Sequence, residues 1–412
     1  MKRYKVITLL LSLILLIGLY GCGDVSNPVD ELTRNQKRAA ELAENVRDKF
    51  WITLGEGDNY FREYYPTLGG EVSKAYLWSH FAALGMQYHL CKLFPENQGY
   101  KDAYREMLDA LKYYKSKSST ETLVKYHSGR GIYPNFGTGE VFFDDNIWVA
   151  RNMLFAYDVF GEDFYLQEAR RVANYIYTGW NEEIDGLVWN ERGLTDQGTA
   201  QELERGLSAN ACAIIVNSWL YQLTGEESYL TWANKFYQFC KRVQDPETYM
   251  YYNGIHTIIQ DGQRLEGSVN KALYAYNPGS MIIADLFMYE ITEGEEYLTD
   301  AFRAAEAAYD AFLMLDLGTN VQYYNDFVWF TAILMESYYA LYPYDAETVK
   351  PYIEVFQKSI DYAYENYKNE HGLLPHNYAT GFATNNSNDR SLLTQSGTAE
   401  IYVLLALCEK TA

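Results

Sequence analysis

The chain has 412 residues, of which 55 are acidic and 34 are basic, and its formal net charge at pH 7 is −21. A strongly negative surface repels polyanions, which argues against nucleic acid as a partner and against polyanionic sugars as ligands. Aromatic residues are abundant, with 40 Tyr, 19 Phe and 8 Trp, and we expect most of them to pack in a core or at its rim.

The first residues predict export. A short basic region precedes an apolar run from Val6 to Leu19, which is too short for a spanning helix and is typical of a signal peptide. The run ends in Leu19-Tyr20-Gly21-Cys22-Gly23, which resembles a bacterial lipobox. We therefore predict a lipoprotein signal peptide over residues 1–21, lipidation of Cys22, a tether over 22–31 and one domain over 32–412. The protein would then be an exported, membrane-anchored lipoprotein at the outer membrane or cell surface. The alternative is an ordinary signal peptide followed by a chance cysteine.

The other four cysteines carry no metal-binding or disulfide pattern. They are Cys91, Cys212, Cys240 and Cys408. Each lies in an apolar helical stretch without CxxC spacing, which predicts buried free thiols. We expect neither a metal nor a cofactor.

Further along the chain, a turn motif recurs at intervals of about 65 residues. It is a glycine followed by acidic residues and then Tyr-Leu or a similar pair, at Gly161, Gly225 and Gly294. Glycine can end a helix in the left-handed conformation, and acidic residues favour the start of the next helix. Segments before these turns are apolar nearly all round, whereas segments after them keep a single apolar stripe.

These alternating segments predict twelve helices. They cover residues 32–50, 74–93, 100–116, 145–160, 163–178, 207–223, 227–242, 271–291, 296–314, 327–342, 348–368 and 392–409. Six inner helices, each paired with an outer helix, make an all-α (α/α)6 toroid. The connections from outer to inner helices are long, over 117–144, 179–206, 243–270 and 369–391. Because they leave the same ends of the helices, we expect them to crowd the face that holds the functional site.

Asp144 and Asp145 are the strongest candidate catalytic residues. They follow Val141-Phe142-Phe143 and open a helix that is apolar round most of its circumference. Two carboxylates at the mouth of a buried helix are costly unless they are paired, capped or used. A glycosidase needs two carboxyl groups, about 5 Å apart for retention and about 6.5–9.5 Å apart for inversion. The alternative is that Asp144 is only an N-cap and Asp145 a first-turn acid favoured by the helix dipole.

At this point the chain is similar to glycoside hydrolase family 76, the endo-α-1,6-mannanases. The resemblance runs in order over roughly residues 70–300. The motifs that carry it are Phe143-Asp144-Asp145-Asn146-Ile147-Trp148, Asp185-Gly186-Leu187-Val188-Trp189-Asn190, Ser208-Ala209-Asn210, Leu223-Thr224-Gly225 and Tyr276-Asn277-Pro278-Gly279. The chain departs from the family at Pro278, where members usually carry Gln, and around 326–330, where a Lys-Gly pair and an Arg are expected.

The resemblance implies a retaining mechanism in which Asp144 is the nucleophile and Asp145 the acid/base, with α-mannan as the substrate. The negative net charge favours a neutral glycan, and we expect a monomer. The candidates for contacts with the sugar are Trp189, Asn190, Asn210, Tyr276 and Asn277. Alternatives are a non-catalytic glycan-binding lipoprotein, another toroid enzyme such as a uronide hydrolase or sugar epimerase, and transglycosylation in place of hydrolysis.

Overall fold

The computed structural model describes residues 32–55, 58–67, 72–132, 135–195, 197–375, 379, 381–382 and 390–411. The predicted signal peptide, Cys22 and the tether lie outside these residues, as do residues 376–378, 380 and 383–389 of the predicted connection 369–391. Thr33–Ala412 form one compact unit. Among the described residues, no helix combines the length and the apolarity needed to cross a membrane.

All twelve predicted helices are present, and they alternate along the chain between an outer and an inner position. The outer helices are α1 (Arg34–Phe50), α3 (Gln98–Asp109), α5 (Asp163–Tyr177), α8 (Glu227–Lys241), α10 (Glu295–Phe312) and α12 (Ala346–Tyr367). The inner helices are α2 (Leu77–Leu93), α4 (Phe143–Phe160), α7 (Leu207–Thr224), α9 (Tyr276–Thr292), α11 (Val328–Leu341) and α13 (Leu392–Thr411).

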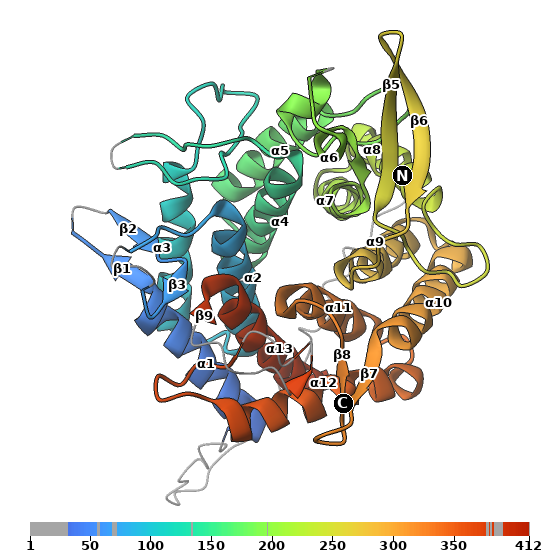
Figure 1. Cartoon of the computed structure of the whole chain (residues 1–412). Helices are drawn as coiled ribbons and strands as arrows, with labels where there is room; N and C mark the ends of the chain where they lie inside the picture. The colour runs from blue at the N-terminus through green and yellow to red at the C-terminus, as the bar shows by residue number, and fades with distance from the viewer. Residues whose placement is uncertain are drawn as a thin grey trace, which may run out of the picture. The chain divides into compact units, whose positions relative to one another are not determined.

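The inner helices form a closed ring. Each contacts the next in the order α2, α4, α7, α9, α11, α13, and α13 contacts α2 again (Figure 1). Each outer helix from α3 onward packs against the inner helix that precedes it in the chain. The first outer helix, α1, packs mainly against α13, the last inner helix. The predicted (α/α)6 toroid is therefore confirmed.

The two kinds of helix differ in the way that the sequence pattern indicates. The inner helix α7 carries no charged residue and is buried round most of its circumference, because it packs on the ring and on an outer helix. The outer helix α5 buries one face, which includes Ala169, Val172, Ala173 and Ile176 at helical spacing. All four cysteines in the described unit are buried and free, as expected.

The repeated turns are confirmed at two of their three positions. Gly161 ends α4 with φ 65°, and Gly225 ends α7 with φ 70°, both in the left-handed region that favours glycine. The third turn is different, because Glu293 takes the left-handed position with φ 57° and Gly294 precedes α10 with φ −81°. The expectation for Gly294 was therefore wrong by one residue.

Strands occupy part of what the sequence indicates as loop. They are β1 (Trp51–Thr53), β2 (Asn59–Phe61), β3 (Tyr64–Tyr65), β4 (Arg205–Gly206), β5 (Gly254–Gln260), β6 (Gln263–Asn270), β7 (Leu313–Asp316), β8 (Val321–Tyr324) and β9 (Arg390–Ser391). All pairings are antiparallel: β1 with β2, β3 with β9, β4 with β5, β5 with β6, and β7 with β8.

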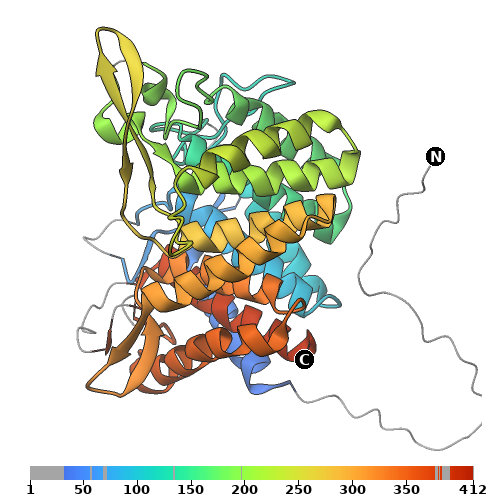
Figure 2. The same cartoon turned by 90° about the vertical axis from the view of Figure 1, so that its right-hand side faces the viewer.

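The hairpins β5–β6 and β7–β8 extend from the same end of the toroid (Figure 2). The base of the first hairpin is anchored by β4, where Arg205 pairs with Ile255 and Gly206 pairs with Gly254. Its register places Asn270 opposite Gly254, close to the start of α7. The sheet β4–β5–β6 therefore borders the face of the toroid where the inner helices begin.

Candidate active site

A cavity of about 820 Å³ opens where several inner helices begin. Its lining comes from α2, α4, α7, α9 and α11 and from three of the predicted long connections. The lining residues are Tyr76, Trp78, Phe81, Ser128, Phe142, Asp144, Asp145, Trp148, Leu187, Val188, Trp189, Gln201, Glu204, Gly206, Ser208, Ala209, Asn253, Asn270, Tyr274, Tyr276, Phe327, Trp329 and Phe330.

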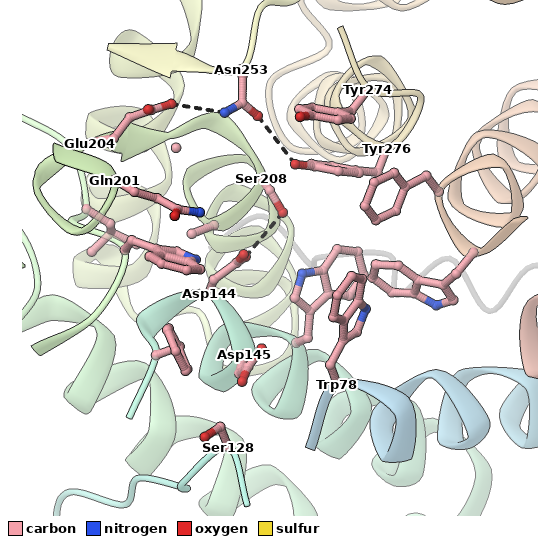
Figure 3. A pocket seen from close by; sticks show the side chains of 18 of the residues that line it. Trp78, Ser128, Asp144, Asp145, Gln201, Glu204, Ser208, Asn253, Tyr274 and Tyr276 are labelled. Carbon is pink, nitrogen blue, oxygen red and sulfur yellow. Dashed lines mark hydrogen bonds between the residues drawn. The ribbon is translucent and has the colours of Figure 1, made fainter. Parts of the chain in front are cut away.

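Asp144 and Asp145 lie together in this cavity, in the first turn of α4 (Figure 3). The helix begins at Phe143, its N-cap is Phe142, and no side chain caps it. Asp144 is therefore not an N-cap, which removes the simplest structural explanation for it. Both side chains are partly exposed to the cavity.

Local packing fixes the start of α4. The ring of Phe143 is buried and stacks on Tyr175 at 4.8 Å between ring centroids, and its backbone N–H donates to the carbonyl oxygen of Trp189. The buried amide of Asn146 accepts from the Tyr126 N–H at 2.7 Å and donates to the Tyr126 carbonyl at 2.9 Å. These contacts tie the helix to the preceding connection, so the two carboxylates project from a rigid support.

The two carboxylates have different surroundings. The Ser208 hydroxyl, on α7, donates to Asp144 Oδ1 at 3.2 Å, and no hydroxyl of a described residue reaches Asp145. Burial raises the pKa of Asp144 to about 6, although hydrogen bonds from the side chains of Ser208 and Trp148 oppose this shift. Burial and the neighbouring charge of Asp144 raise the pKa of Asp145 to about 8. At neutral pH one acid is ionised and the other holds its proton.

An aromatic belt borders the cavity beside the carboxylates. Trp78 stacks on Phe330 at 6.0 Å and meets Trp329 edge-on at 5.8 Å, and Phe330 contacts Tyr276 at 4.4 Å. Tyr276 in turn stacks on Tyr274 at 5.6 Å. On the other side, Phe142 packs on Trp189 at 4.9 Å. Aromatic faces of this kind suit the apolar faces of a sugar ring.

Charge in the cavity is of one sign. The described residues that line it include three acidic side chains, Asp144, Asp145 and Glu204, and no Lys, Arg or His. A carboxylate or phosphate group on a ligand would therefore be repelled at close range. Within the described ranges, no cluster of three His, Cys, Asp or Glu side chains is arranged to hold a metal ion.

Of the five residues predicted to contact a sugar, Trp189 and Tyr276 line the cavity and three asparagines do not. Asn190 is buried, accepts from the Gly193 N–H at 3.1 Å and donates to Glu202 at 3.1 Å. Asn190 therefore stabilises the connection 179–206 and does not line the cavity.

The other two asparagines lie inside helices. Asn210 is fully buried, accepts from the Leu187 N–H at 3.0 Å and donates to the Gly206 carbonyl at 2.6 Å. Asn277 is fully buried in the first turn of α9, and its side-chain amide has no hydrogen-bond partner among the described residues. Position within a motif did not reveal which face of the helix each amide occupies.

Sequence reasoning missed Trp78, Ser208, Glu204, Asn253 and Asn270 as cavity residues. Ser208 stands within a quoted motif, so its hydroxyl was a visible candidate. Glu204, Asn253 and Asn270 come together only through the pairing of β4, β5 and β6, and no sequence spacing indicates that pairing.

A helical toroid with a paired-carboxylate cavity walled by aromatic rings defines a class of carbohydrate-active proteins. The family model described as glycosyl hydrolase family 76 matches residues 43–407 of the chain. The chain therefore belongs to glycosyl hydrolase family 76 and is a glycoside hydrolase. No match was found among curated protein sequences.

Solved structures share the fold. A family 76 mannosidase from Bacteroides thetaiotaomicron VPI-5482 is 23% identical with a TM-score of 0.79, covering 92% of this chain and all of that one. An inactive variant of an α-1,6-mannanase from Salegentibacter sp. HEL1_6, with two adjacent aspartates replaced by asparagine, was solved with α-1,6-mannotriose. It is 18% identical with a TM-score of 0.69, covering 90% of this chain and 99% of that one. An unsaturated glucuronyl hydrolase specific for heparin is 12% identical with a TM-score of 0.62, covering 92% and 96%. At these identities the likeness establishes the fold.

Proposed function

We propose that this glycoside hydrolase cleaves α-1,6-mannosidic linkages within α-mannan by a retaining, double-displacement mechanism. The observation that carries the mechanism is the difference between the two neighbouring acids. Asp144 has the lower pKa and accepts a hydrogen bond from Ser208, whereas Asp145 has the higher pKa. Retaining and inverting glycosidases both need one ionised and one protonated carboxyl group, so the difference supports catalysis by this pair of acids, and the retaining course follows from the family resemblance.

In the first step the Asp144 carboxylate attacks the anomeric carbon, and the bond from that carbon to the leaving oxygen breaks. Asp145 gives its proton to the leaving oxygen, so the departing sugar leaves as a neutral alcohol. The product is a glycosyl ester on Asp144 and an ionised Asp145.

In the second step Asp145 accepts a proton from a water molecule as the water oxygen attacks the anomeric carbon. The ester bond to Asp144 breaks, and the sugar is released with its original anomeric configuration. A sugar hydroxyl in place of water would give transglycosylation by the same steps.

The substrate proposal rests on the charge and shape of the cavity. Its acidic side chains, and the lack of Lys, Arg and His among the described residues that line it, favour a neutral sugar over a uronide. The α-1,6-mannanase from Salegentibacter sp. HEL1_6, whose variant at two adjacent aspartates is inactive and was solved with α-1,6-mannotriose, supports mannan as the glycan and the paired acids as catalytic. Trp189 and Tyr276 are proposed to contact the sugar.

The test is hydrolysis of unbranched α-1,6-mannan by the purified protein, by Asp144→Asn and by Asp145→Asn. We expect oligosaccharides of mixed length from the parent and a loss of about 10³-fold or more in each variant. Early products followed by proton NMR should carry the α configuration. Asp158→Asn is the matched control, because Asp158 lies in the last turns of the same helix, where it contacts Lys92. A parent that binds mannan without cutting it would instead support a binding protein.

We also propose that the protein acts as a membrane-anchored lipoprotein, on the basis of the apolar run Val6–Leu19 and Cys22. Cys22→Ala should prevent incorporation of labelled fatty acid and move the protein from the membrane fraction to the soluble fraction. Equal membrane association of parent and variant would contradict the anchor.

A further inference from the structure

One wall of the cavity is a chain of hydrogen bonds that joins Glu204, Asn253 and Tyr276, with Asn270 as a side branch. We call these four residues the Glu204 relay. Glu204 directly precedes β4, Asn253 directly precedes β5, Asn270 ends β6 and Tyr276 begins α9. The relay therefore occupies the base of the three-stranded sheet, and Figure 3 shows it running from Glu204 through Asn253 to the Tyr276 hydroxyl.

The hydrogen bonds have one consistent direction. Asn253 Nδ2 and Asn270 Nδ2 both donate to Glu204 Oε1 at 2.9 Å, and the Tyr276 hydroxyl donates to Asn253 Oδ1 at 3.3 Å. The Glu204 side chain is only 10% exposed, and its second oxygen lies 3.3 Å from His256 Nδ1. An ionised carboxylate accepts hydrogen bonds only, so it fixes which end of each asparagine amide faces it.

The orientation of the Asn253 amide determines the direction of its hydrogen bond with Tyr276. Because Asn253 turns its Nδ2 toward Glu204, its oxygen faces Tyr276, and the single hydroxyl hydrogen of Tyr276 is used inside the wall. The Tyr276 oxygen can then only accept a hydrogen bond from a ligand in the cavity. Burial raises the pKa of the Tyr276 phenol, and the nearby Asp144 carboxylate raises it further. The phenol therefore stays neutral.

We propose that Glu204 is a positioning and specificity-determining residue, which acts through Asn253 to hold the Tyr276 oxygen as the acceptor for one hydroxyl of the sugar bound beside Asp144. The inference rests on the proposed function. The ligand group that the relay recognises is then a neutral sugar hydroxyl that donates a hydrogen bond.

The variant Glu204→Gln tests the direction of the relay without changing its size. When the glutamine oxygen accepts from His256 Nδ1, the glutamine amide donates to Asn253 Oδ1, which reverses the Asn253 amide and turns its Nδ2 toward Tyr276. The Tyr276 hydroxyl would then present its hydrogen to the sugar in place of a lone pair. Tyr276→Phe removes the same contact directly, and Tyr252→Phe is the matched control. Tyr252 adjoins Asn253, but its hydroxyl donates to Asp245 at 2.7 Å and it does not line the cavity.

The measurement is kcat/KM for an α-1,6-mannotrioside and for its set of monodeoxy analogues. We expect Glu204→Gln and Tyr276→Phe each to lose about tenfold on the parent sugar, and the double variant to lose no more than Tyr276→Phe alone. We also expect one deoxy position to cost the unmodified enzyme about tenfold and to cost neither variant anything. Tyr252→Phe should behave as the unmodified enzyme does.

Losses that multiply in the double variant, or a deoxy penalty that persists in Tyr276→Phe, would overturn the relay while leaving the mannanase proposal intact. An unmodified enzyme that is inert toward the mannotrioside would overturn the proposed function, and this inference with it. Thermal unfolding of every variant separates these results from misfolding. If Glu204→Gln does not fold, the deoxy comparison between the unmodified enzyme and Tyr276→Phe still tests the Tyr276 oxygen as the acceptor, and a deoxy penalty that persists in Tyr276→Phe overturns the relay.

Discussion

The Ser208 hydroxyl donates to Asp144 Oδ1 across 3.2 Å, and this contact joins the first turns of two neighbouring inner helices, α7 and α4. It stabilises the charged form of Asp144 and opposes the increase in pKa that burial causes. In the described part of the chain, no equivalent contact supports the charged form of Asp145. Two acids that are adjacent in the chain therefore differ in their ease of ionisation.

Replacing Ser208 with Ala should raise the pKa of Asp144, because a hydrogen bond to the charged form is lost. Since Asp144 is the proposed nucleophile and must be ionised, the acidic limb of the pH–rate profile should move to higher pH. Loss of one hydrogen bond to a charged group, about 1.5 kcal/mol, corresponds to about tenfold lower kcat/KM below pH 6. Ser208→Thr keeps the hydroxyl and should retain the original profile. An unchanged acidic limb in Ser208→Ala would show that the contact does not act on Asp144.

The pH dependence of kcat/KM should be bell-shaped. Activity requires Asp144 ionised, which is lost as the pH falls through about 6, and Asp145 protonated, which is lost as the pH rises through about 8. An aryl mannoside with a good leaving group needs no proton from the enzyme in its first step. With that substrate, the burst of aryl alcohol from Asp145→Asn should lose the basic limb and keep the acidic one. Loss of the acidic limb instead would exchange the two assigned roles.

Trp78 should contribute to sugar binding through its ring. It is 38% exposed, stacks on Phe330 and meets Trp329 edge-on, so the ring is held in place with one part open to the cavity. Trp78→Ala should raise KM by about three- to tenfold, since an aromatic contact is worth about 0.5–1.5 kcal/mol beyond its buried area. Trp78→Phe should recover part of the loss. A fall in kcat with an unchanged KM would contradict a binding role.

Below the cavity, a buried charge network joins four inner helices. Arg151 donates to Glu336 at 2.7 Å, and His89 lies 3.5 Å from Glu336 and 2.8 Å from Glu400. Every member is less than a tenth exposed. Glu336→Gln should destabilise the protein by about 3–5 kcal/mol, because it leaves the buried guanidinium of Arg151 without its carboxylate partner. Glu106→Gln, which breaks the exposed pair with Arg47, is the control and should cost at most about 1 kcal/mol.

The same network should make stability depend on pH. Burial alone would lower the pKa of His89, but hydrogen bonds and charge interactions with Glu336 and Glu400 raise it to about 9. A folded-state pKa above the ordinary value of 6.5 means that this stabilisation is fully present below about pH 6.5. It is lost as the pH rises through about 9. The free energy of unfolding in urea should therefore fall between pH 7 and pH 9.5, and His89→Gln should show less of this fall.

The sequence by itself determined the ring of helices and the location of the acids. Alternation between segments that are apolar all round and segments with one apolar stripe gives inner and outer helices, because each inner helix is buried on both sides. Asp144 and Asp145 stood out because they open such a buried helix. The turns were also determined locally, apart from the one-residue shift at Gly294, where Glu293 adopts the left-handed conformation.

Only the tertiary structure decided which side chains face the cavity. Asn190 and Asn210 belong to motifs beside Trp189 and Ser208, yet their amides bond to backbone and to Glu202, because buried backbone N–H groups need partners. Glu204, Asn253 and Asn270 meet through the pairing of strands that are up to 66 residues apart in the chain. Sequence periodicity indicates which residues are buried, but the hydrogen bond from Ser208 that lowers the pKa of Asp144 and not that of Asp145 arises between two helices that are brought together only by the fold.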